Sequence, residues 1–396
     1  MIFDSESVFE ENVITVLKQH GWKDGVLRYP TERDLLDNWK DILYRNNNDI
    51  DRLGKYPLTD GEMTQIIEQI ETLRTPLALN SFVNGRTVSI TRDNKEDVAH
   101  FGKEVSLYIY DRKEIAGGKS TYQIAQQPVY PAKNKMLNSR RGDLVLLING
   151  MPLIHIELKK SGIPVSQATN QIEKYAHEGV FTGLFRLVQI FVAMNPDDAV
   201  YFANPGVDKF NPSYYFHWAD YNNEPICGGQ NPGKDEWKLF IGGTSGTAGL
   251  LSIPMAHQLI GFYTIADSAD GCLKVLRSYQ YIAANAISDV VRKCDWEQRP
   301  ATPGRPGGYV WHTTGSGKTM TSFKSAQLIA DSHDADKVVF LMDRIELGTQ
   351  SLKEYRSFAD SETEVQGTEN TGVLRDKLNS TNVNDTLIVT SIQKMS

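Results

Sequence analysis

The spacing of apolar residues changes along the chain, and each spacing predicts a different kind of element. Residues 5–20 place apolar side chains on one helical face, behind a serine that can cap a helix. Residues 31–80 are polar and helical in pattern, with an Asn-rich break at 46–48. Short β-rich runs follow at 106–110 and 121–126. The first third of the chain is therefore predicted to begin as helices and then to enter a sheet.

The strongest strand signal is a pair of apolar runs at 143–148 and 153–159. An Asn-Gly dipeptide separates them, and Asn-Gly between two β-rich runs predicts a hairpin with a tight turn. A helix over 166–178 and a buried strand over 187–193 are expected next.

After residues 204–247, which are rich in Gly, Pro, Asn and aromatics and are predicted as loops and short strands, strand and helix patterns alternate. The predicted strands are 308–311, 337–342 and 386–389, and the predicted helices are 256–262, 278–292, 319–329 and 346–358. Such alternation is typical of a parallel sheet covered by helices. We therefore predict an α/β protein with two domains, residues 1–255 and 256–396, the boundary falling between about 249 and 258.

Bulk composition narrows the class of protein. Hydrophobic residues make up 40% of the 396 residues and charged residues 23%, as in soluble globular proteins. The chain contains no apolar run of about 18 residues or more, so no membrane-spanning helix is predicted. Its three cysteines are scattered, which fits a reducing cytoplasm. With a net charge of −7, any DNA-binding surface must be local or be supplemented by partner subunits.

A Gly-rich loop from His312 to Thr319 lies between a predicted strand and a predicted helix. Glycines in this context let backbone N–H groups surround phosphate oxygens, and the N-terminus of the helix favours the same negative charge. We expect Lys318 to reach the β- and γ-phosphates of a nucleoside triphosphate and Thr319 to hold Mg²⁺. The candidate ATP-binding residues of the loop are Thr314, Gly315, Ser316, Gly317, Lys318 and Thr319.

The loop departs from the usual pattern at one position, since His312 stands where Gly is expected six residues before the lysine. The Gly-Ser-Gly-Lys-Thr core is intact. A flexible loop before an ordinary helix is the alternative interpretation, and the strand-to-helix context favours a phosphate-binding loop.

The predicted hairpin carries a second candidate site. Alternation along a strand places Glu157 and Lys159 on the same face, and the hairpin turn brings Asp143 near them. Two carboxylates and a lysine suit Mg²⁺, and a water bound to the metal becomes a competent nucleophile. Lys159 could orient that water or stabilise developing negative charge. As a bare pattern, Glu-x-Lys is more often a solvent-facing ion pair, but here the carboxylates interrupt apolar runs, where an unpaired charge is costly.

Glu6 and Glu10 are spaced i,i+4 on the first predicted helix. They could support the metal site, although a solvated helix face is the simpler interpretation. On the helix after the hairpin, Gln171 and Tyr175 share the same i,i+4 spacing.

These motifs resemble the restriction (motor) subunit of Type I restriction–modification enzymes, over both halves of the chain. On the nuclease side, the resemblance rests on Asp143, Glu157-Leu-Lys159 and Gln171-x-x-x-Tyr175, a set similar to the PD-(D/E)xK nucleases. Gly142 stands where that family's Pro would be. The resemblance implies catalytic roles for Asp143, Glu157 and Lys159, of which the two carboxylates would bind Mg²⁺, and an association of Gln171 and Tyr175 with the nuclease site and DNA.

On the motor side, four ordered motifs resemble those of superfamily 2 helicases. They are Arg277-Ser-Tyr-Gln280 (the adenine-reading motif, with Arg277 and Gln280 as ATP-binding residues), His312–Thr319 (motif I), Asp343-Arg344 with Leu347 and Gln350 (motif Ia), and Thr390-Ser391-Ile-Gln393-Lys. Outside the family context, Arg277 and Gln280 could equally be surface residues. The resemblance implies a PD-(D/E)xK nuclease-like mixed-sheet domain followed by a partial RecA-like domain.

The resemblance further implies ATP and Mg²⁺ as cofactors, double-stranded DNA as substrate, modification and specificity subunits as partners, and a prokaryotic cytoplasmic location. The implied activity is ATP-dependent translocation followed by cleavage of unmodified DNA. No acidic Walker B motif follows the last motif, so we expect an N-terminal fragment that hydrolyses ATP poorly. Two alternatives remain open: a translocase or helicase whose N-terminal domain binds DNA without cutting it, and a nucleotide-gated interaction module without catalysis.

Overall fold

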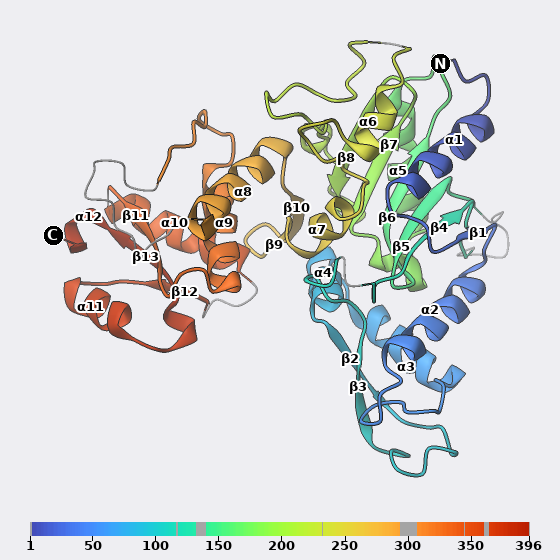
Figure 1. The fold of residues 1–396 in the computed structure, drawn as a ribbon, viewed down its shortest axis with the longest axis horizontal. Coiled ribbons are helices and arrows are strands. Elements are labelled where there is room, and N and C mark those ends of the chain that lie inside the picture. Colours follow the sequence, from blue (N-terminus) through green and yellow to red (C-terminus); the bar gives the residue numbers. More distant parts are fainter. Residues whose placement is uncertain are drawn as a thin grey trace. The chain divides into compact units, whose positions relative to one another are not determined.

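The computed structural model describes residues 2–115, 118–131, 140–231, 233–293, 307–343, 345–359 and 364–395, without the side chains of 345–349. Two compact units make up the chain (Figure 1). The first comprises Met1–Thr264 with Cys272–Val275, and the second comprises Ile265–Gly271 with Leu276–Ser396. The domain boundary predicted at residue 255 stays a prediction. Within the described residues, no helix is both long and apolar enough to cross a membrane.

A six-stranded mixed sheet forms the centre of the first unit, in the order β1-β4-β5-β6-β7-β8. Its strands are β1 (Val26–Arg28), β4 (Tyr122–Gln126), β5 (Leu144–Ile148), β6 (Met151–Leu158), β7 (Ile190–Met194) and β8 (Ala199–Ala203). The pairs β1–β4 and β6–β7 are parallel, and the other three pairs are antiparallel. Strands β4 to β8 are buried along their whole length, which explains their continuous apolar runs.

The predicted hairpin is confirmed as β5 and β6, joined at Asn149 and Gly150. Both residues have positive φ (52° and 83°), the backbone that a two-residue turn requires and that Asn and Gly adopt at the lowest cost. The parallel β6–β7 pair requires a crossover, which contains the predicted helix α5 (Val165–Glu178).

Helix α1 (Glu6–Gln19) confirms the first predicted helix, and Ser5 caps it by accepting a hydrogen bond from the backbone N–H of Val8. The polar segment after it forms α2 (Glu32–Asn46), α3 (Asp60–Thr72) and α4 (Pro76–Asn84).

The antiparallel pair of β2 (Thr87–Thr91) and β3 (Glu104–Tyr108) follows α4. The remaining elements of the first unit are η1 (Gly183–Leu187), η2 (Pro212–Tyr214), α6 (Glu236–Gly242), α7 (Met255–Gly261) and β10 (Cys272–Val275). Strand β9 (Thr264–Asp267) pairs with β10, and the division between the units runs through this hairpin.

A three-stranded parallel sheet in the order β11-β13-β12 forms the second unit's core. Its strands are β11 (Val338–Met342), β12 (Val365–Gly367) and β13 (Leu387–Ser391). Around them lie α8 (Ser278–Lys293), α9 (Lys318–Ser332), α10 (Ile345–Phe358), α11 (Thr371–Asn379), η4 (Val383–Asp385) and α12 (Ile392–Met395). The predicted alternation of helices with parallel strands is confirmed for this part of the chain.

One predicted strand is wrong. Residues 308–311 form no regular element, and the side chains of Tyr309 and Trp311 are 90% and 87% exposed. A strand needs a neighbour for its backbone N–H and C=O groups, and none of the strands in the described part of the second unit pairs with this segment.

Candidate active site

The two predicted carboxylates meet at the open end of the β5–β6 hairpin. Leu144 pairs with Ile156, so the next step outward along the ladder places Asp143 opposite Glu157. The carboxylate of Asp143 also accepts a hydrogen bond of 2.7 Å from the backbone N–H of Leu158. The predicted convergence of Asp143 with the Glu157 strand is therefore confirmed, whereas the catalytic role of these residues remains a prediction.

Burial dominates the electrostatics of this pair. Glu157 has no exposed surface, and burial raises its pKa to about 8 although the ammonium of Lys159 acts in the opposite direction. Burial also raises the pKa of Asp143 well above its usual value, and the negative charge of Glu157 raises it further. Two such carboxyl groups cannot both stay ionised cheaply without a compensating cation.

Lys159 lies at the same end of β6, with only 8% of its surface exposed. Its Nζ is 3.6 Å from Oε1 of Glu157 and 3.5 Å from Oε1 of Glu6 on α1. Nζ also donates a hydrogen bond of 3.0 Å to the carbonyl of Leu158. The ammonium group is thus held between a carboxylate of the sheet and one of the first helix.

Helix α1 contributes more to this region than its sequence indicated. Glu10 is only 2% exposed and accepts hydrogen bonds from the side-chain amides of Gln126 and Gln127. Burial raises the pKa of Glu10, and its charge in turn raises that of Asp143. The prediction of a solvated face for Glu10 is therefore wrong, because α1 packs this side chain against the end of β4. Glu6 is nearly half exposed.

Gln171 and Tyr175 on α5 connect to the segment that leads into Asp143. The side-chain amide of Gln171 donates a hydrogen bond of 2.7 Å to the Tyr175 hydroxyl, which donates one of 2.9 Å to the backbone carbonyl of Arg141. Tyr175 is 6% exposed, and burial raises the pKa of its hydroxyl. The pair therefore holds the backbone two residues before Asp143, a contact that the i,i+4 spacing alone did not reveal.

The donors fit a hard divalent cation. Both carboxylate oxygens of Glu157 are buried and find no hydrogen-bond partner in the described part of the chain, and Asp143 lies opposite. Within the described residues, no group of three or more His, Cys, Asp or Glu side chains is placed to enclose a metal ion. A pair of carboxylates is nevertheless suited to Mg²⁺, which keeps several waters and shares its remaining positions with substrate phosphate.

The second candidate site is the Gly-rich loop before α9. Gly315 and Gly317 have φ of 78° and 83°, which Gly adopts readily, and Gly317 is the N-cap of α9. Nζ of Lys318 donates a hydrogen bond of 3.0 Å to the carbonyl of Thr313, so the ammonium turns back over its own loop. His312, which departs from the usual pattern, contacts the Ser316 hydroxyl through Nδ1 at 3.1 Å.

Of the two predicted adenine-reading residues, Gln280 contacts this loop. Its amide donates to the carbonyl of Gly317 at 3.3 Å, and its carbonyl oxygen accepts the backbone N–H of Arg277 at 3.0 Å. The hydroxyl of Tyr279, which the sequence did not single out, donates to the carbonyl of Ser316 at 2.8 Å. Arg277 in turn donates to that hydroxyl at 3.3 Å. The start of α8 and the loop therefore form one hydrogen-bonded group.

Two protein-family models match the chain, one in each half. Residues 4–210 match the family model described as the Type I restriction enzyme R protein N terminus, and residues 279–396 match the SWI2/SNF2 ATPase model. The chain belongs to the Type I restriction enzyme R protein family. The first match contains every candidate residue of the hairpin site, and the second contains the Gly-rich loop and Gln280 but not Arg277.

Similar R proteins come from several bacteria. The chain is 32% identical over its whole length to a Type I restriction enzyme endonuclease subunit of Staphylococcus saprophyticus, and 33% identical to one of Staphylococcus aureus. It spans 37% of the length of each of these relatives. An endonuclease subunit from Escherichia coli is 29% identical over 53% of the chain and 62% of the relative.

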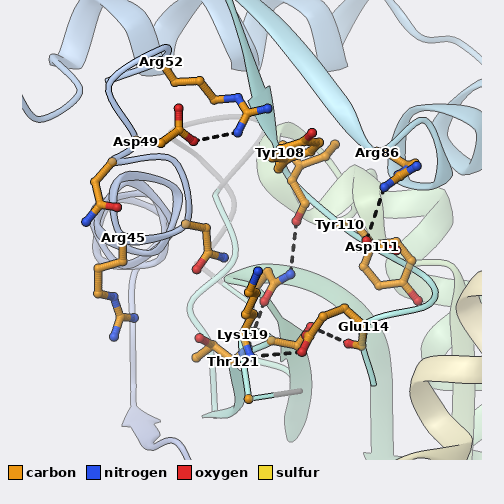
Figure 2. Close-up of a pocket in the computed structure, with 16 residues that line it drawn as sticks. Arg45, Asp49, Arg52, Arg86, Tyr108, Tyr110, Asp111, Glu114, Lys119 and Thr121 are labelled. Carbon is orange, nitrogen blue, oxygen red and sulfur yellow. Dashed lines mark hydrogen bonds and ion pairs between the residues drawn. The ribbon is translucent and has the colours of Figure 1, made fainter. Parts of the chain in front are cut away.

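A polar pocket of about 660 Å³ lies elsewhere in the first unit of this R protein (Figure 2). It is lined by Asn149, at the opposite end of β5 from Asp143 and roughly 20 Å away at about 3.4 Å per residue. Two ion pairs lie in its lining, Arg52 with Asp49 at 2.8 Å and Arg86 with Asp111 at 3.4 Å. None of the predicted site residues lines it.

Proposed function

We propose that this chain carries the Mg²⁺-dependent nuclease centre and the ATP-binding loop of a Type I restriction enzyme. The observation that carries the nuclease half is the buried pair of Asp143 and Glu157, with Lys159 beside it. Burial raises the pKa values of both carboxyl groups, and a bound cation would stabilise their ionised forms. We assign the first unit to the PD-(D/E)xK type on the same residues.

The residues divide the chemistry between them. Asp143 and Glu157 would hold the metal from the two neighbouring strands of the hairpin, whose register places them opposite each other. Bound Mg²⁺ supplies an activated water and stabilises negative charge on the phosphate. Lys159 holds a positive charge close to the same place, where it orients the attacking water or stabilises the developing charge. Gln171 and Tyr175 position Asp143 through the backbone of Arg141.

The second unit is proposed to bind ATP as a RecA-like translocase domain of superfamily 2. Backbone N–H groups from Thr314 to Thr319 would surround the phosphates, with Lys318 exchanging the carbonyl of Thr313 for a phosphate oxygen. Thr319 would hold the Mg²⁺ of the nucleotide. Gln280 is proposed to read the adenine, since its side chain is already tied to the loop that receives the phosphates.

At the level of the whole enzyme, we propose ATP-driven translocation along double-stranded DNA and cleavage of unmodified DNA. Modification and specificity subunits would be the partners, in the cytoplasm of a prokaryote. The chain has a net charge of −7, which is unfavourable for binding DNA alone. Partner subunits that recognise the DNA sequence would supply the missing affinity.

The decisive experiment measures Mg²⁺-dependent DNA cleavage by the assembled enzyme, with and without ATP, for wild type, Asp143→Ala and Lys159→Ala. Both variants should lose cleavage while ATP-dependent movement on DNA continues. Glu104→Ala, which removes a carboxylate from the start of strand β3, serves as the matched control and should cleave like wild type. Cleavage that survives in Asp143→Ala or Lys159→Ala would favour a translocase whose N-terminal domain binds DNA without cutting it.

A further inference from the structure

A second buried pair of side chains stands directly behind Glu157. His155 lies two residues earlier on β6, on the same face of the strand, and has no exposed surface. Its Nδ1 is 2.8 Å from the hydroxyl of Tyr130, which is 1% exposed. Its Nε2 is 3.4 Å from Oε2 of Glu157. The three side chains thus form a continuous line from Tyr130 to the candidate metal ligand.

When Glu157 is ionised, as it must be to hold a cation, the hydrogen atoms along this line have one favourable arrangement. Nε2 of His155 and both oxygens of Glu157 are buried, and none has a hydrogen-bond partner among the described residues. If Nδ1 carried the proton, the lone pair of Nε2 would face a carboxylate oxygen in a dry environment, which is repulsive. If the Tyr130 hydroxyl donates to Nδ1, the proton resides on Nε2 and points towards Glu157.

We propose that Tyr130 and His155 are a positioning relay for Glu157: the tyrosine sets the tautomer of the histidine, and the histidine donates to Oε2 of the carboxylate. This inference rests on the proposed nuclease function, because it concerns how Glu157 is presented to a cation. Oε1 then remains on the side of Lys159, 3.6 Å away, and is available to the metal. Hydrogen bonds to metal-binding residues orient them and raise metal affinity.

The relay also accounts for Gly142, the residue that departs from the Pro of the PD-(D/E)xK pattern. A Cβ at Gly142 would lie 2.4 Å from the Tyr130 hydroxyl and 2.8 Å from Cε1 of His155, closer than such atoms can approach. The backbone N–H of Gly142 also donates to the carbonyl of Pro128 at 3.4 Å, which a proline could not do. The residue before Asp143 is therefore small because Tyr130 and His155 occupy the space beside it.

The chain contains a matched control for this arrangement. The hydroxyl of Tyr122 and Nδ1 of His257 form another buried pair, 2.9 Å apart. There, Nε2 of the histidine faces the backbone carbonyl of Asp111 at 3.0 Å instead of a carboxylate side chain. Tyr122 lies at the far end of β4 from the candidate site, so Tyr122→Phe removes the same kind of contact without touching Glu157, together with a 3.4 Å hydrogen bond to the carbonyl of Ile115.

The first test needs neither metal nor DNA. Long-range ¹⁵N–¹H correlation spectra of protein labelled at its 8 histidines report which ring nitrogen carries the proton, and the His155→Gln variant assigns the signal. The spectra are recorded above pH 8, where Glu157 ionises without metal. Under these conditions we expect His155 to carry its proton on Nε2 in the wild type and to lose that preference in Tyr130→Phe. A proton on Nδ1 in the wild type overturns the relay.

The second test measures Mn²⁺ binding to the protein in the absence of DNA, from the loss of the free-ion paramagnetic resonance signal. Asp143→Asn defines the background from other sites. His155→Phe, which keeps a ring but removes the donor, should weaken binding roughly tenfold or more, and Tyr130→Phe should weaken it by less. His155→Gln restores an N–H donor and should bind more tightly than His155→Phe, while Tyr122→Phe should match the wild type.

Wild-type affinity in both His155→Phe and Tyr130→Phe overturns the relay. A wild-type protein that binds no Mn²⁺ contradicts the proposed nuclease centre instead, and the tautomer measurement then decides on the relay by itself.

Discussion

At the residue scale, the most consequential feature is that Glu157 is a carboxylic acid in a dry setting. Its pKa rises from 4.5 to about 8 on folding, mainly because burial disfavours the charged form. Asp143 is raised in the same direction, and Glu10 and Glu6 add further negative charge nearby. The positive charge of Lys159 acts against this increase in the pKa of Glu157. Burial lowers the pKa of His155 to about 4, so its imidazole ring stays neutral.

The first prediction concerns stability and pH in the absence of metal. Between about pH 4.5 and 8 the folded protein holds a proton on Glu157 that the unfolded chain has released. The free energy of unfolding therefore falls as pH rises through this window. Glu157→Gln removes this contribution and should stabilise the metal-free protein at pH 8, by on the order of a few kcal/mol, with much less effect at pH 5.

Urea unfolding in the presence of a chelator, at pH 5 and pH 8, measures this difference. Asp143 contributes a slope of the same sign, so the variant should retain part of the pH dependence. If wild type and Glu157→Gln lose the same free energy of unfolding between pH 5 and pH 8, Glu157 is not the group that causes the pH dependence.

The second prediction concerns Lys159, whose charge lowers the pKa of Glu157. Lys159→Gln removes that influence, so Glu157 should ionise at higher pH, and Mn²⁺ binding should need a pH higher by roughly one unit. The control is Lys160→Gln, because Lys160 is exposed and its Nζ donates to the carbonyl of Asp4. An unchanged pH profile in Lys159→Gln contradicts the assigned interaction.

At the scale of elements, the hairpin and α5 together set the position of Asp143. The hairpin turn fixes which residues of β5 and β6 are opposite each other, and a slip of one residue would send Glu157 to the other face of the sheet. Helix α5 then fixes the segment before Asp143, because the Tyr175 hydroxyl donates a hydrogen bond to the backbone carbonyl of Arg141. Strand register and helix anchor are therefore both needed for the two carboxylates to meet.

The third prediction follows from that anchor. Tyr175→Phe removes the hydrogen bond to the Arg141 carbonyl, which should cost about 1 kcal/mol of stability and also weaken Mn²⁺ binding and DNA cleavage. Tyr110→Phe is matched, since the Tyr110 hydroxyl donates to the carbonyl of His257 at 2.8 Å. It should lose similar stability with no change in metal binding. Equal effects of the two variants on metal binding would rule out a positioning role for Tyr175.

At the scale of the whole molecule, the chain divides into two units with separate candidate sites. The hairpin site lies wholly in the first unit, and the contacts of the Gly-rich loop with Tyr279 and Gln280 lie wholly in the second. Each site should therefore bind its ligand without the other.

The fourth prediction tests this separation. Lys318→Ala should reduce ATP binding by at least roughly tenfold, because it removes a charged contact to phosphate, and should leave Mn²⁺ binding at the hairpin site unchanged. Asp143→Asn should do the reverse. Titration with a fluorescent ATP analogue and the Mn²⁺ assay measure the two sites separately. If either single variant lost both ATP binding and Mn²⁺ binding, the two sites would not be independent.

The local elements of this R protein could be predicted where one segment carries its own signal. The hairpin, α1 and α5 are examples, since periodicity, turn residues and caps all lie within the segment. The strand expected at 308–311 failed, because apolar character alone does not supply a neighbouring strand. Strands β1, β2, β8, β9, β10 and β12 and helices α6 and α11 were not predicted, because each is short.

The hairpin site also combines features that are local in the sequence with features that depend on distant segments. The sequence by itself determined that Asp143, Glu157 and Lys159 would converge, because alternation along a strand and an Asn-Gly turn are local properties. Only the tertiary structure decided that Glu157 is fully buried, that Glu6 and Glu10 face this end of the sheet, and that Tyr130 and His155 stand behind the carboxylate. These contacts join segments far apart in the chain, and the burial of a charge depends on everything packed around it.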